Sequence, residues 1–243
     1  MHEELTQKLD TARGVLERTG GCAVAYSGGV DSSLVLAIAH EVLGSRCLAV
    51  IATSSTYARR EHEQALKVAG MIGARHEVVP SEELDIPGFR DNPTNRCYFC
   101  KKELFARVRE VASRHGLAAV ADGTNADDLT DYRPGLLAVR EMGVLSPLRE
   151  AGLTKSEIRL ISREVYGLPT AGKPAMACLA SRFPYGSQIT GAKLDQVDRL
   201  EGFLLEQGFV YVTLDLQGYR TGSMNEPKRL GREDVLAAGK IQG

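Results

Sequence analysis

One short stretch, residues 23–33, constrains the fold of this chain more than any other feature of the sequence. An apolar run from Ala23 to Tyr26 stops at two glycines, Gly28 and Gly29, and an apolar pattern with helical spacing starts at Leu34. This pattern predicts a buried strand, a tight turn and the N-terminus of a helix. Glycines let the backbone turn sharply and approach a ligand, and the first N–H groups of a helix attract anions. We therefore expect a phosphate-binding loop at this junction.

The loop resembles the SGGxDS loop of the PP-loop superfamily, the N-type ATP pyrophosphatases, over the whole of Ser27 to Ser33. It has neither the Lys-Ser or Lys-Thr pair of a Walker loop nor the third glycine of a dinucleotide fingerprint. The resemblance implies an enzyme that binds ATP and releases pyrophosphate while it attaches AMP to a substrate oxygen. The residues expected to bind ATP here are Ser27, Gly28, Gly29, Asp31, Ser32 and Ser33. Because a carboxylate beside phosphates requires a cation, we expect Mg²⁺ next to Asp31.

Predicted strands and helices alternate along most of the chain. Apolar runs predict strands at residues 47–52, 76–79 and 117–121, and amphipathic patterns predict helices at 5–16, 59–72 and 104–112. This alternation predicts an α/β fold with a parallel sheet and right-handed crossovers. The resemblance implies that this sheet is Rossmann-like, of the adenine nucleotide alpha hydrolase (PP-loop) type.

A division into two units is expected in the second half of the chain. A capping-box sequence from Thr154 to Glu157 opens a helix that ends near Gly167 and Pro169. We expect a PP-loop ATP pyrophosphatase domain at residues 1–168. Residues 169–243 are expected to form a smaller C-terminal α/β unit for sulfur transfer, substrate binding and oligomerisation. Its expected elements are a helix around 194–205, a strand at 209–216 and a short terminal helix after 228.

Polar residues follow two of the predicted strands. Ligands of parallel sheets bind where the strands end, and a guanidinium group pairs well with phosphate. The further residues expected to bind nucleotide are Thr53, Gly123, Thr124, Asn125 and Arg133. Asp127 is expected to join Asp31 as a magnesium ligand, with a solvated turn as the alternative. For Thr53 a polar strand exit is an equally good interpretation.

The five cysteines fall into different environments. Cys22 and Cys47 lie in or beside apolar runs and are predicted to be small core residues. Cys97 and Cys100 form a Cys-x-x-Cys at the start of a predicted helix. Such a pair can be a redox dithiol, half of a zinc site, or two ligands of an iron–sulfur cluster, and purely structural cysteines are the alternative. The helix terminus and the basic neighbours Arg96, Lys101 and Lys102 are expected to favour thiolates.

Cys178 lies in a segment, residues 172–186, that Pro and Gly residues bracket. We predict a loop with at most one turn of helix there. Lys173 and Arg182 give this cysteine an electropositive setting, which stabilises a thiolate. Of the five cysteines, Cys178 is therefore the candidate nucleophile.

Five motifs in order resemble those of the LarE family of ATP-dependent sulfur transferases, which help to build the nickel-pincer nucleotide cofactor of lactate racemase. They are Ser27–Ser32, Asn95–Lys101, Gly123–Asp128, Arg133–Gly135 and Pro174–Gly186. The resemblance implies that the enzyme adenylates a carboxylate of pyridinium-3,5-dicarboxylate mononucleotide with MgATP and then replaces AMP with sulfur. A carboxylate is a poor electrophile, AMP makes it a good one, and a thiolate is a strong nucleophile. Asp31, Cys178 and Arg182 are the expected catalytic residues.

The family resemblance implies two ways to supply sulfur. In one, Cys178 attacks, its C–S bond breaks, and dehydroalanine remains after a single turnover. In the other, Cys97, Cys100 and Cys178 hold a 4Fe-4S cluster whose fourth iron is open and carries a sulfide. Because all three cysteines are present, we favour the cluster. A sulfur donor protein or free sulfide would then reload it.

Charge and composition limit the alternatives. The 30 Lys and Arg residues nearly balance the 31 Asp and Glu residues, so the chain offers no overall basic surface for nucleic acid. Thiolation of transfer RNA is thus the less favoured enzymatic function. A non-catalytic ATP sensor is a further alternative, and it would bind ATP without releasing pyrophosphate. The polar N-terminus and the short apolar runs indicate a cytoplasmic protein with no membrane span. The resemblance also implies a homo-oligomer.

Overall fold

A four-stranded parallel sheet forms the centre of the computed structural model, which describes residues 3–130 and 134–209. The strands are β1 (Cys22–Ala25), β2 (Cys47–Thr53), β3 (Arg75–Pro80) and β4 (Ala119–Ala121), in the order β3-β2-β1-β4. In the register, Cys22 aligns with Cys47 on one side and with Ala119 on the other. The predicted parallel α/β sheet is confirmed.

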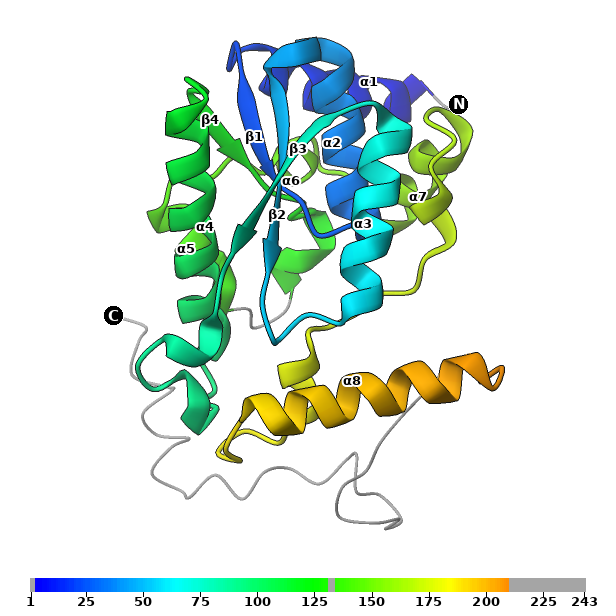
Figure 1. The fold of residues 1–243 in the computed structure, drawn as a ribbon. Helices are drawn as coiled ribbons and strands as arrows, with labels where there is room; N and C mark the ends of the chain where they lie inside the picture. Colours follow the sequence, from blue (N-terminus) through cyan, green and yellow to red (C-terminus); the bar gives the residue numbers. More distant parts are fainter. Residues whose placement is uncertain (1–2, 131–133, 210–243) are drawn as a thin grey trace.

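Helices cover both faces of this sheet, as Figure 1 shows. One face packs against α1 (Glu3–Glu17), α2 (Val30–Leu43), α3 (Arg59–Ile72), the short α6 (Pro147–Glu150) and α7 (Lys155–Glu164). The other packs against α4 (Arg96–Arg114) and α5 (Pro134–Glu141). Because neighbouring strand residues point to opposite faces, Val24 joins the first core and Ala23 the second. Strands buried on both faces explain the uninterrupted apolar runs in the sequence.

Most predicted elements appear where the sequence places them. The helix predicted at residues 59–72 is α3, and the predicted capping box closes the start of α7 with Thr154 and Glu157. Cys22 and Cys47 are fully buried, which confirms them as core residues. The apolar segment after residue 143 adds no further strand among the described residues: Leu145 makes a single bridge to Ala121, and α6 then begins.

A third apolar cluster lies beyond the carboxyl edge of the sheet, which we define as the edge where the strands end. There α8 (Gly191–Glu206) packs its Leu194 and Val197 against Leu84, Phe89 and Phe183. Short 3-10 turns complete the described chain at Gly44–Arg46, Glu83–Asp85, Phe89–Asp91, Ala126–Thr130, Pro169–Gly172 and Leu179–Arg182. Between residues 173 and 186 the one helical element is the turn Leu179–Arg182, which confirms the predicted loop with at most one turn of helix.

The predicted C-terminal unit can be followed only in part. The helix predicted around 194–205 is α8, whereas the strand predicted at 209–216 and the terminal helix after 228 lie outside the described residues, apart from Phe209. The boundary at residue 168 therefore stays a prediction. None of the helices within 3–130 and 134–209 is long and apolar enough to cross a membrane.

Candidate active site

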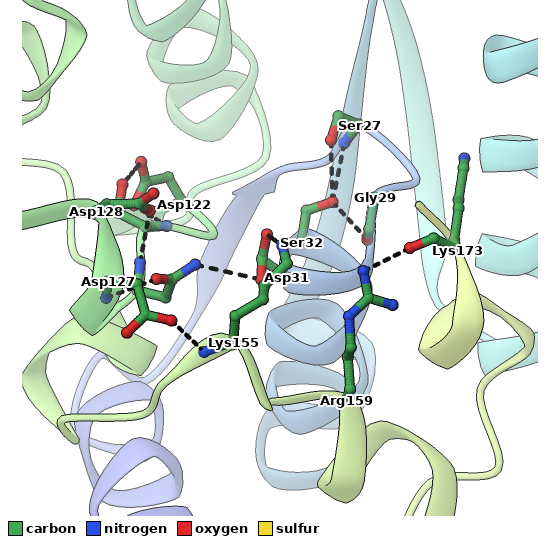
Figure 2. Close-up of polar contacts among 12 residues, drawn as sticks. Ser27, Gly29, Asp31, Ser32, Asp122, Asp127, Asp128, Lys155, Arg159 and Lys173 are labelled. Atoms are coloured by element: carbon green, nitrogen blue, oxygen red, sulfur yellow. Dashed lines mark hydrogen bonds and ion pairs between the residues drawn. The ribbon is translucent and has the colours of Figure 1, made fainter. Parts of the chain in front are cut away.

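The phosphate loop joins β1 to α2 as the sequence predicts. Gly28 has a φ of +72°, and a Cβ atom on it would lie 2.7 Å from the Cβ of Ala65 in α3. Only glycine fits here, because both the backbone conformation and the packing exclude a side chain. The Ser32 hydroxyl lies 3.2 Å from the Ser27 hydroxyl and 3.3 Å from the Ser27 backbone nitrogen, as Figure 2 shows. The loop is thus ordered around a small group of hydroxyls and N–H donors.

The N-terminus of α2 faces this loop without a side-chain cap. Gly29 is the N-cap residue, and no side chain accepts a hydrogen bond from the first turn of the helix. Gly123, after β4, approaches so closely that a Cβ atom would lie 2.8 Å from the backbone nitrogen of Ser32. The positive end of the helix dipole and its N–H groups are therefore available to an anion at the carboxyl edge.

Asp31 in the first turn of α2 is the centre of a polar network at this edge. Its Oδ2 lies 2.5 Å from the Nζ of Lys155, and its Oδ1 accepts a hydrogen bond of 3.4 Å from Asn125. Asp127 uses its Oδ2 to accept the backbone N–H of Lys155 at 2.8 Å (Figure 2). The structure thus brings Asp31, Asn125 and Asp127 together as predicted. The role of Asp127 as a magnesium ligand stays a prediction.

Other predicted nucleotide contacts lie in different settings. Ser33 is fully buried, with its hydroxyl 3.5 Å from that of Tyr26, and so lies apart from the hydroxyls of Ser27 and Ser32. Successive helix residues are about 100° apart, which turns Ser33 into the core. The Thr53 hydroxyl donates to the carbonyl of Val79 at 3.3 Å. This contact within the sheet is consistent with the alternative interpretation of Thr53 as a polar residue where the strand ends. Thr124 is held by the buried carboxylate of Asp122, and Arg133 lies outside the described residues.

Lys173 reaches back to the phosphate loop from the segment that carries Cys178. Its Nζ donates to the carbonyl oxygen of Gly28 at 3.1 Å and lies 2.7 Å from the carboxylate of Glu61. Arg159 in α7 holds this segment by donating to the carbonyls of Ala171 and Lys173 at 2.6 and 2.7 Å. A positive charge therefore stands beside the loop on the side opposite Lys155, as Figure 2 shows.

The other three cysteines gather at the start of α4. Cys97 is exposed, and Cys100 and Cys178 are half-buried against the third apolar cluster. Burial raises the pKa of the Cys100 thiol, and the Glu83 carboxylate, which accepts from Cys100 Sγ at 3.8 Å, raises it further. Burial also raises the pKa of the Cys178 thiol, and the nearby Cys97 contributes to this rise. The structure thus brings the predicted cysteine set together.

The prediction that basic neighbours favour thiolates needs correction. For Cys100, Lys101 lowers the thiol pKa, but burial outweighs it. For Cys178 the cation that lowers the pKa is Arg96, and burial again prevails. Lys173 is engaged at the phosphate loop, as described above. Arg182 instead donates to the Glu201 carboxylate at 2.8 Å and to the carbonyls of the Cys178 loop, so that it holds the loop backbone.

The cysteine set does not form a site for a single metal ion in the part of the chain that the structure describes. Within 3–130 and 134–209, no three His, Cys, Asp or Glu side chains are close enough to hold one metal ion, so the zinc alternative gains no support there. In a 4Fe-4S cluster each cysteine binds a different iron, so the ligand sulfurs are spread farther apart. Cys97 and Cys100 lie on α4 and Cys178 lies just before the turn Leu179–Arg182, and a cluster shared by the three stays a prediction.

Three residues of this edge were not predicted as site residues. Lys155 is part of the capping-box sequence. A helix that begins just after a loop at the carboxyl edge places its first residues near the ligand site, and this signal could have identified Lys155. Glu83 is fully buried, with hydrogen bonds from Thr56 and Cys100. The sequence around Glu83 reads as a polar loop and gives no such signal. Asn92 is fully buried as well, in a loop that the sequence marks only by its prolines.

Comparisons with known proteins show which proteins this chain is similar to in sequence and in fold. The NAD synthase family matches residues 5–117. An uncharacterized protein of Synechocystis sp. is 40% identical, covering 91% of this chain and 98% of the relative. The pyridinium-3,5-bisthiocarboxylic acid mononucleotide synthase of Lactiplantibacillus plantarum is 33% identical, covering 91% of this chain and 95% of the relative. The solved NMN synthetase of Francisella tularensis shares the fold at 14% identity, with a TM-score of 0.57 over 87% of this chain and 99% of that one.

Proposed function

This chain belongs to the LarE-like family of PP-loop ATP pyrophosphatases, and on that basis we propose that it converts a carboxylate of pyridinium-3,5-dicarboxylate mononucleotide into a thiocarboxylate. In the first step a carboxylate oxygen bonds to the α-phosphorus of ATP, and the bond from that phosphorus to pyrophosphate breaks. In the second step sulfur bonds to the acyl carbon, and the bond from that carbon to AMP breaks. The first step gives the acyl carbon a good leaving group, AMP, and the second step uses sulfur to displace it.

One observation carries the proposal. The segment 173–178 begins at Lys173, which contacts the phosphate loop at Gly28, and ends at Cys178, which packs with Cys100 against the same apolar cluster. A carboxylate activated at the loop therefore lies one short segment away from the thiols. An acyl adenylate reacts readily with water, so a sulfur source beside the place where it forms favours sulfur transfer.

The residues of the loop have distinct roles in the first step. The N–H groups at the start of α2 and the hydroxyls of Ser27 and Ser32 would bind the phosphates. Asp31 would hold Mg²⁺, which neutralises phosphate charge when it is bound. Lys155 and Lys173 would stabilise the pyrophosphate as it leaves, since each places an ammonium group at the loop.

For the second step we propose the cluster as the sulfur source. Cys97, Cys100 and Cys178 would hold a 4Fe-4S cluster, which supplies a sulfide from an iron that no side chain binds. Arg182 would keep the Cys178 loop in place through its bonds to the carbonyls of Ala177 and Cys178. Sacrifice of the Cys178 sulfur is the second candidate, favoured by the same loop position. We also propose that residues 169–243 contribute to substrate binding and to a homo-oligomer.

Pyrophosphate release tests the first step. Anaerobic enzyme with MgATP should release pyrophosphate only when the pyridinium dicarboxylate mononucleotide is present. Asp31→Asn should abolish the release, whereas Asp195→Asn, which removes a surface carboxylate paired with Arg59 at 3.1 Å, should not. Hydrolysis of ATP to ADP, or binding of ATP without cleavage, would contradict the proposal.

A further inference from the structure

Asn92 has a conformation that ordinary side chains avoid. It lies in the loop just before α4 with a φ of +53°, and among the described residues it is the only non-glycine with positive φ. Asn tolerates this left-handed region better than most residues, yet the conformation persists only where surrounding contacts favour it. Asn92 is also fully buried. The contacts of Asn92 must therefore stabilise both its burial and its left-handed backbone conformation.

Every polar group of the Asn92 side chain is hydrogen-bonded. Its Nδ2 donates to the carbonyl oxygens of Phe183 at 3.2 Å and Pro184 at 2.7 Å, and its Oδ1 accepts from the Arg96 guanidinium. Its backbone carbonyl accepts the N–H of Gly186 at 2.9 Å. These bonds connect the loop before the Cys97–Cys100 helix with the loop after Cys178. A buried, fully satisfied amide of this kind fixes two segments in one arrangement.

Arg96 makes a second connection between the same segments. It is buried, with 5% of its surface exposed, and its Cζ lies 4.9 Å from the centre of the Tyr185 ring. This distance is within the range of a cation–π contact. Arg96 directly precedes Cys97, and Tyr185 follows Cys178 by seven residues. The contacts of Asn92 and of Arg96 therefore both join the segment beside Cys97 and Cys100 to the segment that follows Cys178.

We propose that Asn92 and Arg96 form a latch that sets the spacing of Cys97 and Cys100 relative to Cys178 before any sulfur source binds. The latch consists of these two side chains, the backbone of residues 183–186 and the Tyr185 ring. Asn92 and Arg96 are positioning residues, because the latch acts on the two backbones that carry the thiols. The inference rests on the proposed function only in that the three thiols work as one site. A site whose ligands are held in advance loses less entropy when its group binds.

Bridging of thiols in the chain without ATP, substrate or iron tests the latch. The first variant is Cys97→Ser, in which a reagent that fluoresces only after it has joined two thiols should bridge Cys100 to Cys178. Peptide mass spectrometry identifies the bridged pair. Adding Asn92→Gly keeps the left-handed backbone but removes the side chain, and should slow this bridging about tenfold, because the effective concentration of one thiol at the other falls. Arg90→Ala, in the same loop, removes a half-exposed side chain that donates to Leu84, and should leave the rate unchanged.

The Cys97–Cys100 pair gives an internal control. In a Cys178→Ser background these thiols lie one turn apart on α4, so Asn92→Gly should not change their bridging. Equal slowing of both pairs, or no slowing of the Cys100–Cys178 pair, would overturn the latch. If thermal unfolding shows that Asn92→Gly does not fold, Arg96→Gln is measured in the same way with the same expectation. Thiocarboxylate formation is scored separately, so a failure of the proposed function does not alter the bridging result.

Discussion

The Nζ of Lys155 lies 2.5 Å from the Oδ2 of Asp31, although 124 residues separate them in the sequence. The contact joins the first turn of α7 to the first turn of α2, so two helix N-termini and one ammonium group converge at the carboxyl edge of the sheet. Such a site favours a polyanion with a cation at Asp31. The pair therefore marks the centre of the ATP site that we propose.

Replacement of Lys155 tests this assignment. Lys155→Met should weaken binding of MgATP about tenfold, or ~1.4 kcal/mol, because the phosphates lose one positive charge. Lys8→Met is the matched control, since Lys8 of α1 makes a similar contact of 2.7 Å with Glu157 on the same helix. Equal affinities of the two variants, measured by calorimetry, would remove Lys155 from the site.

Gly28 and Gly29 should respond differently to alanine. Gly28→Ala forces a side chain into a φ of +72° and against Ala65, which should cost about 1 to 3 kcal/mol of stability. Gly29 has a φ of −77° and its nearest neighbour to a new Cβ is the Ser27 hydroxyl at 3.5 Å, so Gly29→Ala should fold normally. Denaturant unfolding checks both. An added Ala65→Gly should recover part of the loss in Gly28→Ala, and failure to do so would mean that the clash is unimportant.

Glu201 should contribute to stability at neutral pH. It is buried in α8, and its hydrogen bonds to Arg182 and Arg60 lower its pKa despite the opposing effect of burial. A lowered pKa means that the contribution is present above the unfolded pKa of about 4.5 and is lost as the pH falls through the folded pKa. Glu201→Gln should therefore lower the free energy of unfolding by about 1 to 3 kcal/mol near pH 7. The difference should shrink in acid, and a pH-independent difference would contradict this.

Glu83 should behave in the opposite way. Burial raises its pKa, so its contribution is present below the unfolded pKa of about 4.5 and is lost as the pH rises through the folded value. The stability of Glu83→Gln relative to the unchanged chain should thus improve with rising pH. Denaturant unfolding at several pH values measures this trend. A trend of the same sign as that of Glu201→Gln would show that the charge of Glu83 is compensated in the folded chain.

Cysteine labelling should follow exposure and pKa. With iodoacetamide at about pH 8, exposed Cys97 should react first and Cys100 and Cys178 more slowly, because raised pKa values leave less thiolate. Cys22 and Cys47, buried with pKa values of about 12, should not react in the folded chain. Peptide mass spectrometry over time gives the order. Labelling of Cys178 ahead of Cys97 would show that the loop opens or that Arg96 dominates its ionisation.

The sequence predicts the parts of this protein that depend on neighbouring residues. The Gly28–Gly29 turn, the strand runs and the capping box of Thr154 and Glu157 are local patterns, and the structure contains all of them. The parts that it misses depend on distant contacts. Lys155 meets Asp31, and Asn92 meets Pro184, only after the chain has folded. Charge neighbours in sequence were likewise a poor guide to the cysteines, because burial outweighs nearby Lys and Arg residues.

Intact-protein mass spectrometry during turnover tests the central claim most directly. Anaerobically prepared enzyme is mixed with MgATP and the pyridinium dicarboxylate mononucleotide, and product and protein mass are followed together. We predict thiocarboxylate in excess over enzyme while sulfide is supplied, from a polypeptide of unchanged mass, because Cys97, Cys100 and Cys178 keep their sulfur as ligands. Thiocarboxylate formed once per chain, with loss of the mass of H₂S at Cys178, would contradict that account and identify the cysteine itself as the donor.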